Sequence, residues 1–221
     1  MTDRLPTAKD GRVGQDVGMT RWMTVVGVAL PGLALAGFGW LVHPSFLDPS
    51  TARAWWTLHV LLVPVFPLIA VAIWVLLRGE RGVLAWGARV AAYGFATFYT
   101  GLDVLDGIGA GLVTDVGQGD GPAVGRLFEV GDQLGAVGVL CLLVAAVLGG
   151  MVLVRRDGVR ALPGTVVLAA SCYPFLEGHI FHPTGVIAML GVATGCALLA
   201  AARRPGEAAV ADRSEPLIVP G

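Results

Sequence analysis

Histidine, a frequent metal ligand and proton carrier in proteins, occurs only four times in this chain. Two of the four, His179 and His182, stand beside Glu177 in the stretch LEGHIFHPTG, between two strongly apolar runs. The other two, His43 and His59, flank the connecting segment PSFLDPSTARAWWTL. All four therefore border long apolar runs, where an imidazole needs a partner or a ligand.

Carboxylates occur in two pairs with a spacing that suits shared chemistry. Asp103/Asp106 and Glu129/Asp132 are each separated by three positions, which puts both carboxylates of a pair on one face of a helix. Carboxylate combined with neutral imidazole is a donor set for zinc, copper or non-haem iron, whereas magnesium and calcium prefer oxygen ligands alone. These residues make a transition-metal site the first chemistry to consider.

The composition determines the kind of protein that must position these residues. Hydrophobic residues make up 55% of the 221 positions, charged residues make up 14%, and the mean hydropathy is +0.74. A soluble domain carries about a quarter charged residues, so the chain is predicted to be an integral membrane protein with the lipid bilayer as its solvent. A net charge of −1 and the lack of a basic run give no sign of nucleic-acid binding.

Apolar stretches long enough to cross a bilayer as helices recur along the chain, since about 20 apolar residues are needed for one crossing. Pro174, Gly178 and Pro183 divide the last apolar region into two such stretches. We predict an all-α, polytopic bundle of six transmembrane helices over residues 21–203, between disordered tails at 1–20 and 204–221. The expected helices are Trp22–Val42, Trp56–Leu77, Val83–Val113, Arg126–Val154, Ala161–Glu177 and Pro183–Ala202.

The distribution of basic residues predicts the orientation of the bundle. Twelve of the fifteen Lys and Arg residues fall in the two tails or in the second and fourth connections, and Arg89 lies just inside the third helix on the same side; only Arg53 and Arg126 fall on the other side. Because short cytoplasmic loops retain positive charge, both termini are expected to be cytoplasmic in a multi-pass protein of the cell membrane.

This topology brings the chemically interesting residues to one level, at the outer end of the bundle. We expect a divalent metal ion, with zinc as the first choice, held by residues from separate helices: His43, His59, Asp103, His179 and His182. In a hydrolytic version, Glu129 or Asp106 would act as general base toward metal-bound water. A lipid or lipid-linked substrate would reach such a site from the outer leaflet.

Other functions fit the same residues. Paired histidines could bind haem, and buried acids and histidines could conduct protons or cations, although the inner halves of the helices offer almost no ionisable group to continue such a path. A structural or scaffold subunit without catalysis is the remaining alternative. In that case the helix carboxylates would form hydrogen bonds with Tyr99, Thr100, Gln133 or the histidines.

Overall fold

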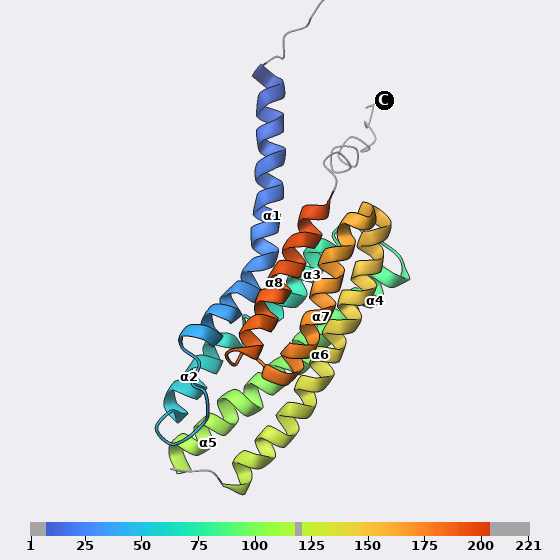
Figure 1. Ribbon diagram of the computed structural model, residues 1–221. Coiled ribbons are helices and arrows are strands. Elements are labelled where there is room, and N and C mark those ends of the chain that lie inside the picture. Colours follow the sequence, from blue (N-terminus) through green and yellow to red (C-terminus); the bar gives the residue numbers. More distant parts are fainter. Residues whose placement is uncertain (1–7, 118–120, 204–221) are drawn as a thin grey trace, which may run out of the picture.

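The computed structural model describes residues 8–117 and 121–203, with side chains from Arg21 onward. These residues form helices and turns without a strand, which confirms the predicted all-helical class (Figure 1). The elements in chain order are α1 (Ala8–Leu41), α2 (Ala52–Leu62), α3 (Pro67–Leu76), α4 (Val83–Leu102), the π-helix η1 (Asp103–Gly109), α5 (Ala110–Gly117), α6 (Pro122–Asp157), the 3-10 helix η2 (Gly158–Ala161), α7 (Leu162–Gly178) and α8 (Thr184–Ala202).

Four stretches of the described chain are long and apolar enough to cross a membrane: Arg21–Leu41, Ala52–Leu76, Pro122–Gly178 and Thr184–Ala202. The third has 57 residues, which is far more than one crossing needs. It contains α6 and α7, which turn back on each other at Gly158, where φ is 76°. Figure 1 shows these two helices side by side. Four candidate spans are thus found where six were expected.

The exposed surface of the helices carries many apolar side chains, which suits contact with lipid. Large apolar side chains are exposed on several helices, for example Leu30 on α1, Tyr93 on α4 and Ile187 on α8, with exposed fractions of 58%, 64% and 62%. A soluble monomer rarely leaves so many large apolar side chains in water. The exposed surface therefore agrees with a membrane protein.

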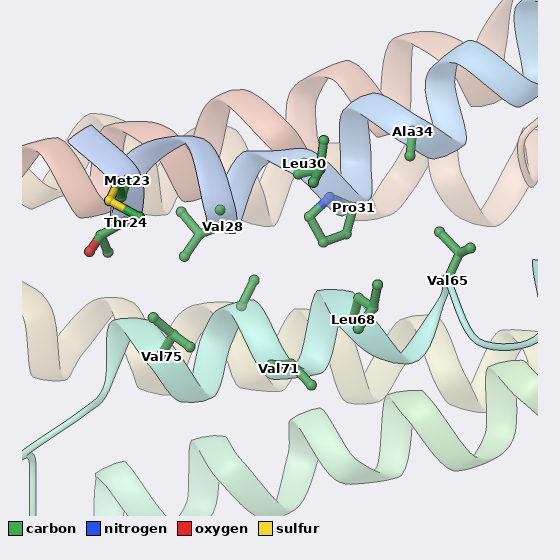
Figure 2. A pocket seen from close by; sticks show the side chains of 12 residues that line it. Met23, Thr24, Val28, Leu30, Pro31, Ala34, Val65, Leu68, Val71 and Val75 are labelled. Carbon is green, nitrogen blue, oxygen red and sulfur yellow. The ribbon is translucent and has the colours of Figure 1, made fainter. Parts of the chain in front are cut away.

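An apolar groove of about 730 Å³ lies between α1 and α3 (Figure 2). Leu30, Pro31 and Ala34 line it from α1, and Leu68 and Val71 from α3. No Asp, Glu, Lys, Arg or His is among its lining residues. The groove is compatible with lipid chains and offers no group for catalysis or metal binding.

The first two helices differ most from the sequence expectation. Residues 8–20 belong to α1, so the first helix begins at Ala8 rather than after a tail that ends at residue 20, and its first turns project beyond the other helices (Figure 1). The second expected helix is divided into α2 and α3 by a turn at residues 63–66. Pro64 and Pro67 explain this break, because neither can donate the backbone hydrogen bond that a continuous helix requires. The expected tail residues 1–7 and 204–221 lie outside the described residues.

Candidate metal centre

Three of the four histidines converge although they are far apart in sequence. His43 follows α1, His59 lies in α2, and His179 follows the last residue of α7. One ring nitrogen from each lies within 4.8 Å of the others. Zinc–nitrogen bonds are about 2.0–2.1 Å long, so the three nitrogens would have to approach to about 3.3 Å from one another to bind one tetrahedral ion. We call His43, His59 and His179 the three-histidine cluster.

Backbone carbonyls determine which nitrogen is free on two of these rings. His43 Nδ1 lies 2.7 Å from the carbonyl oxygen of Pro44, and His59 Nδ1 lies 2.8 Å from that of Trp55. A carbonyl can only accept, so Nδ1 carries the proton in the neutral form of both rings and Nε2 carries a lone pair. Metal-binding histidines use the same arrangement, in which one nitrogen donates to an outer partner and the other binds the ion.

His179 is held by a side chain instead of a carbonyl. Its Nδ1 lies 2.6 Å from the hydroxyl oxygen of Tyr99 on α4, and its ring stacks on that of Tyr99 with centroids 5.5 Å apart. The residue has φ of 46°, in the left-handed region that a non-glycine residue rarely adopts. Such backbone positions concentrate at functional sites, and here the conformation accompanies a ring turned into the bundle.

A buried carboxylate lies next to the cluster. Asp103 has an exposed fraction of 0%, and its Oδ1 lies 3.9 Å from His59 Nε2. Neither Asp103 oxygen, nor Nε2 of His43 or of His179, has a hydrogen-bond partner among the described residues. A buried group that lacks its partner costs about 1–3 kcal/mol, and an ionised one costs more. A cation placed between Asp103 Oδ1 and His59 Nε2 would give the buried carboxylate a partner.

The π-helix η1 carries Asp103 at its start and Asp106 three residues later. Single π-helical turns inside longer helices are rare and frequently occur at functional sites. Trp55 Nε1 donates a hydrogen bond of 3.0 Å to the backbone carbonyl of Asp106, which ties η1 to the helix that carries His59. This bond fixes Asp103 and His59 relative to each other.

Glycines allow the close approach of the helices around the cluster. A Cβ atom on Gly107 would overlap the imidazole of His59, and one on Gly111 would press on Trp55 and Trp56. A Cβ atom on Gly131 of α6 would overlap the carboxylate of Asp106. The bare backbone at these positions therefore leaves room for the site's side chains.

Two histidines of the cluster, His43 and His179, lie outside the candidate spans, and burial keeps both in the neutral form. Desolvation lowers the pKa of His43 below its ordinary value of 6.5, against a smaller opposing effect of the hydrogen bond to Pro44. Desolvation also holds the pKa of His179 well below 6.5, and the neighbouring histidines lower it further. Neutral imidazole is the form that binds metal, so both rings are ready to act as ligands near pH 7.

Two of the residues expected at the site lie elsewhere. His182 is exposed, and its ring makes an edge contact with Trp40, with centroids 4.4 Å apart. Glu129 is also exposed and forms an ion pair of 2.7 Å with Arg126. The structure records no contact of either residue with the three-histidine cluster in the described part of the chain. The other expected base, Asp106, is buried with an exposed fraction of 8%.

Tyr99 lies at the site with a partner that the sequence does not indicate. In the structural alternative it is one of several possible partners of the helix carboxylates, whereas its hydroxyl group contacts His179. The signal for this contact is weak in the sequence, because the two residues are 80 positions apart. The carbonyls of Pro44 and Trp55 carry no sequence signal at all, because every residue has one.

Comparison with protein-family models, with characterised proteins and with solved structures found no match to this chain. The function must therefore be inferred from the site itself.

Proposed function

We propose that this protein is a multi-pass protein of the cell membrane that binds a divalent transition-metal ion, with zinc as the first candidate. His43, His59 and His179 are the proposed histidine ligands, and Asp103 is the proposed fourth ligand. A bound ion of this kind would act as a Lewis acid toward any water or substrate that it contacts.

One observation carries the proposal. The lone-pair nitrogen of His43 and both oxygens of Asp103 are buried acceptor atoms without a partner among the described residues, and the lone-pair nitrogen of His59 lies 3.9 Å from Asp103 Oδ1. A purely structural polar network would need donors facing these acceptors, and none is found among the described residues for His43 Nε2 or Asp103. A metal cation supplies the missing positive charge and the missing partner for all of them.

The choice of a transition metal follows from the donor set. Three imidazoles suit zinc, copper, nickel or iron, and a single carboxylate does not provide the six to eight oxygens that calcium takes. Haem fits less well, because the imidazole centroids of His43 and His59 are 5.2 Å apart and the rings are in edge contact. The cavity that borders His179 measures about 150 Å³, below the roughly 300–1,000 Å³ typical of sites for drug-sized ligands.

For a hydrolytic activity toward a lipid or lipid-linked substrate, Asp106 is the better of the two expected bases. It is buried beside the proposed ligand Asp103 on η1, and its Oδ1 has no partner among the described residues. Glu129 is engaged with Arg126 on the surface. We therefore assign the role of general base to Asp106 and not to Glu129.

The proposed topology has six spans, with α6 and α7 as separate crossings, α4 continuing through η1 and α5 as the third, and both termini in the cytoplasm. Single cysteines introduced at Ser50 and Arg81 would test it. A membrane-impermeant maleimide added to intact cells should label Ser50→Cys and should label Arg81→Cys only after the membrane is permeabilised. The reverse labelling would contradict the orientation.

Cobalt substitution tests the metal centre directly. Metal-free protein titrated with Co²⁺ should develop the intense visible absorption of a four-coordinate ion, saturating at one equivalent, and zinc should displace it. The His43→Ala variant should not develop this band. A weak spectrum of octahedral cobalt, equal in both proteins, would contradict the proposal.

A further inference from the structure

A small cavity at the surface of the bundle reaches His179, one residue of the three-histidine cluster. It has a volume of about 150 Å³ and lies between α4, α6 and α7. Tyr99 and His179 line it, and so do Asp132 of α6 and Glu177 of α7. Tyr99 is almost completely buried, with an exposed fraction of 1%, whereas both acids are exposed. The cavity therefore leads from an acidic opening to the buried Tyr99 and to its hydrogen-bond partner His179.

The two acids at this opening are not neutralised by a basic side chain. In the part of the chain that the structure describes, neither Asp132 nor Glu177 belongs to an ion pair, and Arg126, on the same helix as Asp132, is paired with Glu129. Two carboxylates from different helices at the mouth of a narrow, low-dielectric cavity concentrate cations there. Since the next polar groups inward are Tyr99 and His179, an attracted cation would arrive directly at a ligand of the cluster.

We propose that this cavity is the route by which a hydrated divalent cation reaches the three-histidine cluster, with Asp132 and Glu177 attracting the cation at the opening. The inference rests on the proposed metal centre and adds the path to it. Asp132 and Glu177 are access residues and not ligands, so they set the rate of loading and leave the final occupancy unchanged.

The groove between α1 and α3 cannot provide this route. It is larger, at about 730 Å³, but it is lined by apolar residues and Thr24 and lacks any ionisable side chain (Figure 2). A hydrated divalent cation would lose its water there without gaining a ligand, which is strongly unfavourable. The acidic cavity is smaller but has the correct charge and borders His179.

The test measures the rate at which metal-free protein takes up Zn²⁺, followed with a chromophoric zinc indicator at low ionic strength. The Asp132→Asn/Glu177→Gln double variant should load about tenfold more slowly than the wild type and reach the same stoichiometry. Raising the salt concentration should slow the wild type and remove most of the difference, because the attraction is screened. The Arg126→Gln/Glu129→Gln double variant is the matched control: it removes an exposed ion pair from the same helix, leaves the net charge unchanged and should load at the wild-type rate.

Each contrary result has a separate meaning. If Asp132→Asn/Glu177→Gln loads as fast as the control, while the wild type reaches one equivalent, the access route is overturned and the metal centre stands. If Asp132→Asn/Glu177→Gln binds no zinc although it unfolds at the wild-type temperature, the route is also overturned, because the acids would then be ligands. A wild type that takes up no zinc overturns the metal centre, and the route with it.

Discussion

His179 Nδ1 lies 2.6 Å from the hydroxyl oxygen of Tyr99, in a contact between α4 and the residue that follows α7. A hydroxyl group can donate or accept, unlike the carbonyls that hold His43 and His59. His179 is therefore the one cluster histidine whose tautomer can change. With an ion on Nε2, Nδ1 must carry the proton and donate to Tyr99. Tyr99 is in this sense a positioning residue for a metal ligand.

Replacing Tyr99 by phenylalanine should weaken metal binding while the bundle stays folded. Loss of an outer partner of a metal-bound histidine typically lowers affinity 10- to 100-fold, and we expect a loss of about tenfold for zinc. Tyr93→Phe is the control, because this tyrosine lies on the same helix with an exposed fraction of 64%. Competition with a zinc chelator measures both variants, and equal affinities for the two would remove Tyr99 from the site.

Asp103→Asn should change the stability of the protein in opposite directions with and without metal. The wild-type carboxylate is fully buried without a hydrogen-bond partner, so its replacement should stabilise the metal-free protein by about 1 kcal/mol. The same change removes a charged ligand, so added zinc should raise the unfolding temperature less than it does in the wild type. Thermal unfolding in detergent with and without zinc measures both effects.

Asp157 provides the contrast for Asp103. It is equally buried, with an exposed fraction of 0%, but its Oδ2 pairs with Arg156 at 2.8 Å. Asp157→Asn should therefore destabilise the protein by about 3 kcal/mol, with or without zinc, because it leaves a mostly buried arginine with fewer partners. If Asp103→Asn behaved in the same way, Asp103 would be a structural group.

Gly107→Ala should disturb both folding and metal binding. The added Cβ atom would overlap the ring of His59, so α2 must move away from η1, and overpacking of this kind costs about 1–3 kcal/mol. Gly37→Ala, in α1, is the matched control, because nothing lies within 4 Å of the added atom. It should leave zinc affinity unchanged. Wild-type affinity in Gly107→Ala would show that the position of His59 is not critical.

The stability of the metal-free protein should fall as the pH drops below 6.5. Burial lowers the pKa of His43 and of His179 in the folded state, whereas in the unfolded chain both have their ordinary value of 6.5. Below pH 6.5 the unfolded chain therefore binds protons that the folded protein does not, and this favours unfolding by up to about 1.4 kcal/mol per pH unit for each residue.

Thermal unfolding between pH 7.5 and 5 measures this dependence. The His43→Gln/His179→Gln double variant should show a flatter profile over the same range. A wild-type profile as flat as that of the double variant would contradict the buried, neutral state of the two rings.

The sequence predicts the helical fold and much of the cluster. Long apolar runs in a membrane must form helices. The distribution of arginines orients these helices, and this orientation predicts that His43, His59 and His179 lie together at the outer end of the bundle. The structure brings these three together. Depth along the bundle, however, does not determine which way a side chain faces. His182 and Glu129 were placed at the same level, yet both are exposed.

The finer geometry could not be read from the sequence. The π-helix that begins at Asp103 changes the helical register, and no periodicity in the sequence reveals it. This change alters the direction in which the Asp106 carboxylate points. The close approach of the His59 ring to Gly107 depends on the packing of α2 against η1. Glycine spacing alone indicates close packing but does not identify the packed partner.

The most direct test of the metal centre is the metal content of the protein purified in detergent, compared with the His59→Ala variant. Elemental analysis should find about one zinc or other transition-metal ion per wild-type chain and less than a tenth of that in His59→Ala. The His182→Ala control should retain the wild-type content, because that ring is exposed outside the cluster. A wild type with no more metal than His59→Ala, both before and after incubation with zinc, would contradict the central claim.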